Sequence, residues 1–113
     1  MQKTTVLWIS VALLVAGLLQ PASVVAADSE AAYKAKCASC HGPDGKGKQK
    51  IAEMLKIDLS RLELVDDETS KKSDAELARI TRDGEGKSMK PFKSQFSDAE
   101  ITELVKYIRS LKK

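Results

Sequence analysis

Histidine, cysteine and large aromatic side chains are scarce in this sequence of 113 residues, which has one His, two Cys, one Trp, two Tyr and two Phe. A structural zinc site uses about four Cys or His ligands, so these three residues would have to recruit Asp or Glu. So few large side chains would also form a meagre core unless a large apolar cofactor filled the middle. The sequence has no internal repeat and no strongly basic, aromatic-interleaved segment, which leaves nucleic-acid binding without support.

Residues 1–27 have the pattern of a secretory signal peptide. Lys3 precedes an apolar run over residues 6–19, Pro21 interrupts it, and small residues follow as far as Ala27. We expect cleavage after Ala27, with Ala26 as the close alternative. The run is shorter than the roughly 18 to 20 residues that a membrane-spanning helix needs, and no cysteine for lipid attachment lies at the cleavage site. The predicted mature chain is an exported single domain over residues 28–113, without a stable membrane anchor.

The most informative motif is Cys37-Ala38-Ser39-Cys40-His41. Two cysteines at this spacing, followed directly by histidine, form the pattern by which haem c is attached. The two thiols can form thioethers to the two vinyl groups of one porphyrin, and His41 is then brought under the iron as an axial ligand. A thioredoxin-type redox pair would be expected near a βαβ pattern, which is missing here. A zinc site would be incomplete, and a Cys37–Cys40 disulfide would close a tiny loop and leave His41 unexplained.

The second axial ligand must be something other than histidine, because His41 is the only one in the chain. Met89 lies in a Gly/Lys/Pro-rich loop over residues 84–92 that has neither helical nor strand periodicity. Met54 lies on the apolar stripe of a predicted helix, where methionine usually packs. It also follows His41 by only 13 residues, which is a short segment to reach the opposite face of the porphyrin. We therefore predict Met89 as the second ligand. Met54, an open iron and a lysine-ligated iron remain the alternatives.

The sequence predicts an all-α fold. Residues 28–37 are rich in helix formers, with Asp28 or Ser29 as the N-cap. Apolar spacing predicts a short helix over residues 49–56, whereas residues 58–72 read as irregular. Capping boxes at residues 73–76 and 97–100 open two further helices, the first running to about Arg82. The apolar residues expected to cover a haem face or to form the stripe of the last helix are Leu59, Leu62, Leu64, Val65, Ile101, Leu104, Val105, Ile108 and Leu111.

Over residues 28–113 the chain resembles the class I mono-haem c-type cytochromes of bacterial periplasms. The matching features are Tyr33 four residues before Cys37, the block C-A-S-C-H-G-P-D-G-K-G, the Met89 loop G-E-G-K-S-M-K-P-F, and L-V-K-Y-I near the end. The resemblance implies a small cytochrome c fold of three to five helices wrapped round one covalently bound haem. It also implies that the first and last helices cross, with Tyr33 near Leu104 and Tyr107, and that the Met89 loop closes the haem pocket.

The chain departs from the family pattern at three places. Ser29 stands where many members have glycine at the helix crossing. Many members orient the ligand histidine through a proline carbonyl several residues beyond the glycine turn, but Pro43 lies too early in this chain to serve. No tryptophan remains in the mature chain to bind a haem propionate, so Arg61, Lys56 or a backbone N–H is expected to take that role.

Charge is distributed unevenly along the predicted mature chain. Its net charge is only +2, but residues 34–50 carry +4, residues 84–93 carry +2, and residues 51–76 carry −4. Both basic segments flank predicted haem ligands, so a lysine rim at an exposed haem edge would attract acidic redox partners. Solvated turns are the alternative interpretation.

The predicted function is one-electron transfer between redox partners in the periplasm by a monomer with one haem c, attached through Cys37 and Cys40 and ligated by His41 and Met89. We expect an electron carrier rather than an enzyme, because His/Met ligation leaves no free coordination site. A haem subunit of a larger oxidoreductase is the alternative. A sensor or peroxidase with a labile Met89 is disfavoured, because no second histidine is available as a distal acid or base.

Overall fold

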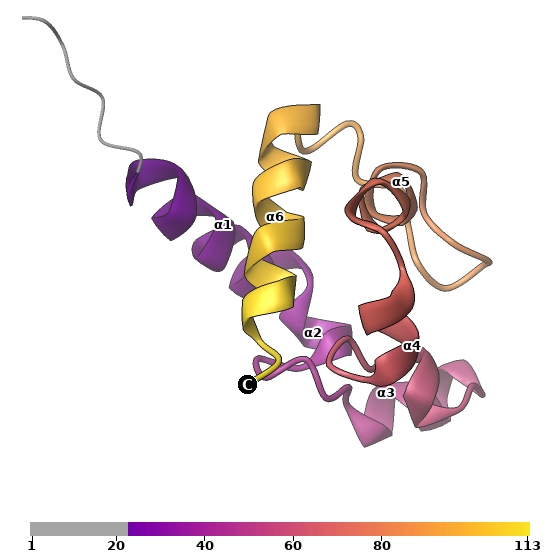
Figure 1. Cartoon of the computed structure of the whole chain (residues 1–113). Coiled ribbons are helices and arrows are strands. Elements are labelled where there is room, and N and C mark those ends of the chain that lie inside the picture. The colour runs from indigo at the N-terminus through magenta and orange to yellow at the C-terminus, as the bar shows by residue number, and fades with distance from the viewer. Residues whose placement is uncertain (1–22) are drawn as a thin grey trace, which may run out of the picture.

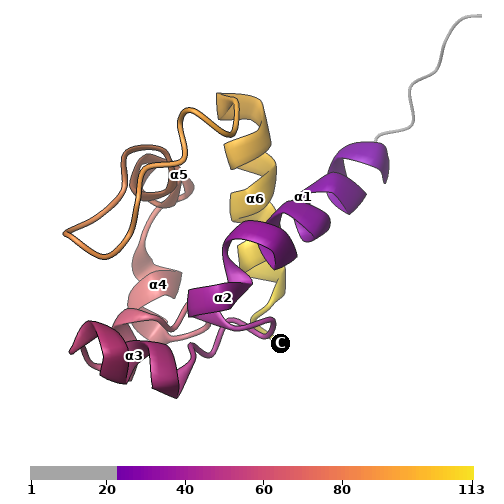
Figure 2. The same ribbon diagram turned by 180° about the vertical axis from the view of Figure 1, so that it is seen from behind.

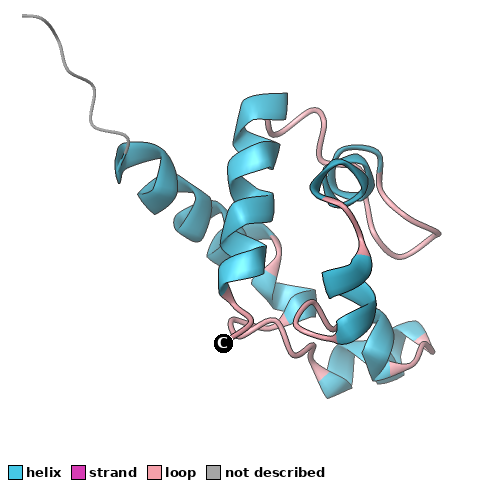
Figure 3. Cartoon of the chain, viewed as in Figure 1, coloured by secondary structure: helices cyan, strands magenta, loops and turns pink. Residues whose placement is uncertain are grey.

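The computed structural model of the protein describes residues 23–113, and this part of the chain is helical, with loops and no strands (Figures 1 and 3). The elements in order are α1 (Ser23–Lys36), α2 (Ala38–His41), α3 (Gln49–Leu55), the 3-10 helix η1 (Leu59–Arg61), α4 (Asp67–Lys71), α5 (Asp74–Asp83) and α6 (Asp98–Ser110). The all-α fold class is confirmed. The described residues form six α-helices rather than three to five, because α2 and α4 are single turns of four and five residues.

The first and last helices cross, as predicted, and both views of the ribbon show it (Figures 1 and 2). Tyr33 of α1 is fully buried and belongs to one core cluster with Leu104 and Ile108 of α6. Its ring lies 5.2 Å from that of Tyr107, with an interplanar angle of 52°. This aromatic pair, with Tyr33 buried and Tyr107 half-buried, adds to the apolar area that the helix crossing removes from water.

Helix α1 begins earlier than the sequence indicated. It starts at Ser23, so Asp28 and Ser29 lie inside the helix and neither is its N-cap. Residues 24–27 end in two alanines, which favour helix, and they are still attached to the chain. The helix therefore continues upstream of residue 28. Most of the predicted signal peptide, residues 1–22, lies outside the described residues, so the cleavage site stays a prediction. None of the described helices is long and apolar enough to cross a membrane.

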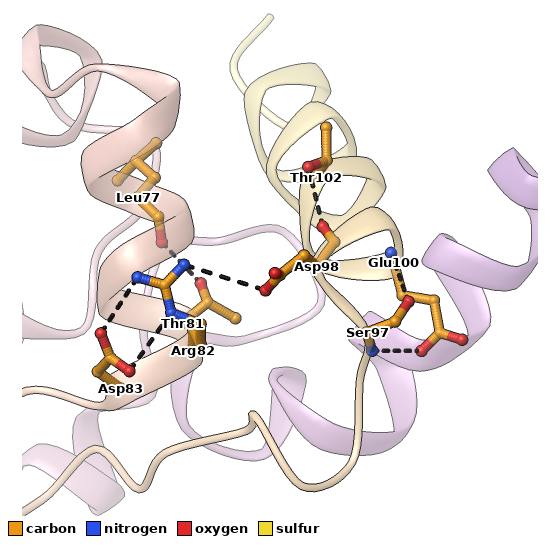
Figure 4. Close-up of polar contacts among 8 residues, drawn as sticks. All are labelled: Leu77, Thr81, Arg82, Asp83, Ser97, Asp98, Glu100 and Thr102. Carbon is orange, nitrogen blue, oxygen red and sulfur yellow. Dashed lines mark hydrogen bonds and ion pairs between the residues drawn. The ribbon is translucent and has the colours of Figure 1, made fainter.

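Serine caps fix the starts of α5 and α6. The Ser73 hydroxyl accepts a hydrogen bond from the backbone N–H of Glu76 at 3.1 Å. Ser97 and Glu100 form the complete capping box, with each side chain accepting from the other's backbone N–H (Figure 4). These bonds satisfy N–H groups that have no partner inside the helix. Both helix starts therefore lie where the sequence placed them.

The segment between α3 and α5 is more regular than expected, because residues 58–72 include η1 and α4. The carboxylate of Asp66 accepts from the Thr69 backbone N–H at 2.9 Å and so caps α4. An aspartate three residues before the amide that it caps is an ordinary helix-start signal. The prediction of an irregular segment was wrong here. The capping residue Asp66 lies among other acidic residues, which were interpreted as a solvated stretch.

Arg109 of α6 ties α4 and α5 to the C-terminal helix. Its guanidinium donates to the backbone carbonyls of Thr69, Ser70 and Lys72 and bonds the carboxylate of Asp74 at 2.9 Å. The Thr69 carbonyl also accepts from the backbone N–H of Lys72, the C-cap of α4, at 3.2 Å, and the guanidinium fork suits several acceptors at once. This contact holds the start of α5 against α6, and these two helices form facing walls of the candidate site.

Candidate functional site

The predicted attachment motif forms a short helical turn at the end of α1. Cys37 is the N-cap of α2, and its backbone N–H donates to the Tyr33 carbonyl at 2.8 Å. The backbone N–H of His41 donates to the Cys37 carbonyl at 3.0 Å, so the first cysteine and the histidine lie one turn apart. The buried Tyr33 hydroxyl donates to the carbonyl of Gly42 at 2.7 Å. The aromatic core thus fixes the backbone on both sides of the motif.

The loop after α2 brings η1 close to His41. The backbone N–H of Gly47 donates to the His41 carbonyl at 2.7 Å, which folds the loop back over the motif. A Cβ at Gly47 would lie 2.9 Å from a methyl carbon of Leu59 and 3.0 Å from the Cβ of Leu62. Gly47 also has a positive φ of 77°, so glycine suits this close approach of the loop to η1 both sterically and conformationally.

This approach supplies the group that orients His41. The imidazole Nδ1 lies 2.8 Å from the backbone carbonyl of Leu62. A carbonyl can only accept, so Nδ1 carries the proton and Nε2 presents a free lone pair. Burial lowers the pKa of His41, although the bond to Leu62 acts in the opposite direction. A neutral imidazole with one nitrogen held and the other free is the form that binds a metal.

The predicted ligands meet in one pocket. It is lined by Cys37, His41 and Met89, together with the mainly apolar residues Leu64, Leu77, Ile80, Thr81, Leu104 and Ile108. The apolar walls come from α5, α6 and the segment after η1, and Leu64 is among the residues expected to cover a haem face. Segments 48 residues apart in the chain therefore contribute an imidazole and a thioether to the same space.

Cys37 and Cys40 are not joined by a disulfide in this structure. Burial raises the pKa of the Cys37 thiol to about 11, with a smaller contribution from Cys40. A redox-active C-x-x-C pair has the opposite property, a lowered thiol pKa. Cys40 is half-buried and lies in the same helical turn as Cys37, but it is not among the residues that line the pocket. Within the described residues no group of three His, Cys, Asp or Glu side chains is placed to hold a metal ion.

The two candidate methionines have different surroundings. Met89 is half-buried in the pocket wall, whereas Met54 of α3 is 69% exposed and is absent from the pocket lining. The expectation that Met54 packs in the core was wrong. Ala52 is the buried residue of α3, and Ile51 and Leu55 are half-buried, so the inward face is rotated from the predicted stripe toward Ala52 and leaves Met54 outside.

Arg61 and Lys56, named from the sequence for a haem propionate, are both exposed and neither lines the pocket. A second concavity lies between the loop after α2 and the C-terminal end, lined by Pro43, Asp44, Lys46, Val65, Ser110, Leu111, Lys112 and Lys113. It is larger, but it contains no thiol, imidazole or thioether. The chemistry of a haem site is therefore concentrated in the pocket beside His41.

The donor set of that pocket fits haem c, because the Cys37 thiol, an imidazole and a thioether line a mainly apolar space. A family model described as cytochrome c oxidase, cbb3-type, subunit III, matches residues 25–108. Among solved structures, the chain is similar to the KustC0563 c-type cytochrome, with 27% sequence identity and a TM-score of 0.62. That likeness covers 75% of this chain and 98% of the other. No curated protein sequence matches the chain.

Proposed function

The chain belongs to the c-type cytochrome family described as cytochrome c oxidase, cbb3-type, subunit III, and we propose that it is a one-electron carrier with a single haem c bonded to Cys37 and Cys40. Membership in this family implies haem-based electron transfer rather than catalysis. In the proposal His41 and Met89 are the two axial ligands, and the mature protein works in the periplasm. The observation that carries the proposal is the pocket lined together by Cys37, His41 and Met89.

The haem, when bound, supplies the one-electron chemistry, and the residues of the chain hold and insulate it. The Leu62 carbonyl keeps the His41 proton on Nδ1 and fixes the plane of the ring. Such an outer hydrogen bond also raises the basicity of a ligating histidine. Leu77, Ile80, Leu104 and Ile108 exclude water from the site. Thioether ligation and burial both favour the reduced form and so raise the reduction potential.

The exposed lysines of the Met89 loop support the proposed choice of partners. Lys87 and Lys90 flank Met89 in sequence, and both are exposed. Neither belongs to an ion pair within the described residues, in contrast to Lys34, Lys106 and Arg109. Unpaired cations beside a redox centre attract acidic surfaces, and the attraction weakens as salt screens it. We infer that acidic redox proteins dock at this loop, with a rate of electron transfer that falls as ionic strength rises.

A second candidate function is that of a haem subunit in a larger oxidoreductase. The description of the matching family, a subunit of an oxidase, favours this possibility. The two functions differ in one measurable property, because a free carrier purifies alone as a monomer. Stable copurification with a large oxidoreductase from the native membrane or periplasmic fraction would favour the subunit.

The ligand assignment is tested with Met89→Ala and the matched control Met54→Ala. In the oxidised holoprotein, Met89→Ala should remove the weak sulfur-to-iron absorption band at the red end of the spectrum. It should also lower the reduction potential and admit carbon monoxide to the reduced iron. Met54→Ala should change none of these, since Met54 is exposed and does not line the pocket. An unaltered spectrum in Met89→Ala, or fast carbon monoxide binding by the unmutated protein, would contradict the assignment.

A further inference from the structure

The backbone of the Met89 loop is fastened to the end of α5. Glu85 and Met89 exchange two backbone hydrogen bonds, of 3.1 and 3.3 Å, which close a narrow turn. Beyond the turn, the backbone N–H of Phe92 donates to the Thr81 carbonyl at 3.1 Å, and that of Lys93 donates to the Arg82 carbonyl at 3.1 Å. The loop therefore leaves α5, turns at once and returns alongside its last residues.

Gly84 lies where the returning backbone passes closest to α5. A Cβ at this position would lie 2.6 Å from the Met89 carbonyl oxygen, 2.9 Å from the Pro91 nitrogen and 3.1 Å from the Lys90 carbonyl carbon. All three are backbone atoms, which cannot rotate away as the end of a flexible side chain can. Gly84 also has φ 78° and ψ 174°, a conformation that is essentially restricted to glycine. Steric space and backbone conformation both demand glycine here.

Gly86, two residues later, offers a contrast within the same loop. It also has a positive φ, of 60°. A Cβ at Gly86 would have no heavy atom within 4 Å. An alanine at this position therefore carries a backbone cost but pushes against nothing.

From this contrast we propose that Gly84 is a positioning residue for Met89, because the absence of a side chain at Gly84 allows the Met89 backbone to close against the end of α5. The inference rests on the proposed ligation by Met89. The Met89 thioether lines the pocket, and the backbone carbonyl of the same residue packs directly against Gly84. Thr81, whose carbonyl accepts from the Phe92 backbone N–H of the returning segment, also lines the pocket. A shift of the Met89 backbone away from α5 would carry the thioether away from the space that it shares with His41.

The test compares Gly84→Ala with Gly86→Ala in the haem-containing protein. We expect Gly84→Ala to lose the sulfur-to-iron band, or to keep it only in part, and to bind carbon monoxide in the reduced state. We expect Gly86→Ala to keep the full band and to exclude carbon monoxide. Equal spectra and equal carbon monoxide binding in the two variants would overturn the proposal.

A double variant separates positioning from a general structural role. If Gly84 acts through Met89, then Gly84→Ala should add no further spectral change or carbon monoxide binding in a Met89→Ala background, because the two substitutions act on one contact. If Gly84→Ala yields no folded haem protein while Met89→Ala does, Gly84 serves the fold as a whole and the proposal is overturned. Failure of the proposed function has a different signature, since Met89→Ala would then leave the band intact. A band lost in Met89→Ala but kept in Gly84→Ala refutes only the role of Gly84.

Discussion

Replacement of Tyr33 by phenylalanine should destabilise the protein without altering the haem ligands. The Tyr33 hydroxyl is the donor to the carbonyl of Gly42, the residue directly after His41, at 2.7 Å, and both residues are buried. Tyr33→Phe keeps the ring in the core and removes this bond, while the Gly42 carbonyl still accepts from the backbone N–H of Gly45 at 3.2 Å. Because the acceptor keeps one partner, the loss is that of a single hydrogen bond, about 0.5–1.5 kcal/mol. In a domain of this size each kcal/mol lowers the melting temperature by about 4–8 °C.

Tyr107→Phe is the matched control. The Tyr107 ring packs against that of Tyr33, but its hydroxyl makes no hydrogen bond within the described residues. Thermal and guanidinium unfolding of the two haem-containing variants, followed by far-ultraviolet circular dichroism, gives the comparison. We expect Tyr33→Phe to melt a few degrees below Tyr107→Phe, with both absorption spectra unchanged. Equal melting temperatures would show that the bond to Gly42 does not hold the motif in place.

The stability that Tyr33 contributes should depend on pH. Burial is the main cause that raises the pKa of Tyr33 far above its ordinary value, with smaller contributions from Cys37, Tyr107 and Asp44. The unfolded chain releases this proton near pH 10, whereas the folded protein retains it. The resulting stability is complete below about pH 10 and declines as the pH rises further. The stability difference between the unmutated protein and Tyr33→Phe should therefore shrink above about pH 10, and a constant difference would contradict this reasoning.

Three further outcomes follow from the contacts described. Arg109→Met should lower stability by about 1–2 kcal/mol, since three carbonyls and one carboxylate lose a half-exposed donor, while Arg79→Met, an exposed arginine on α5, should have little effect in the same denaturant titration. At high pH, where amines become good ligands, Lys87 or Lys90 should replace Met89 on the iron. The double variant Lys87→Ala/Lys90→Ala should therefore keep the sulfur-to-iron band to higher pH. Loss of the band at the same pH in the double variant and the unmutated protein would count against this exchange. The chain produced without haem should be mostly unfolded, and a well-dispersed NMR spectrum of that material would disprove it.

Local signals in the sequence predicted the helices of this fold that begin with a clear cap. Ser73 and Ser97 fixed the starts of α5 and α6, because the capping hydroxyl and the amide that it satisfies lie three residues apart. The start of α4 at Asp66 was missed among other acidic residues, although its cap has the same spacing. Apolar periodicity was less reliable in α3, where Met54 faces solvent and Ala52 faces the core.

The chemistry of their side chains also predicted roles for Cys37, His41 and Met89 in binding a haem. The structure places all three in the wall of one pocket. The partner of His41 could not be found in this way. The acceptor is the backbone carbonyl of Leu62, 21 residues away, and a backbone carbonyl is present in every residue. Its position depends on the close approach of η1 to Gly47, a tertiary contact with no local sequence signal.

We expect one haem to be bonded covalently to this chain after export and cleavage. The intact mass of the purified coloured protein under denaturing conditions tests this bond, because a non-covalent haem then separates from the polypeptide. We expect the mass of residues 28–113 plus one haem, with the chain beginning at residue 27 as the alternative cleavage product. The mass of the bare polypeptide, with the colour released into acidified acetone, would contradict it.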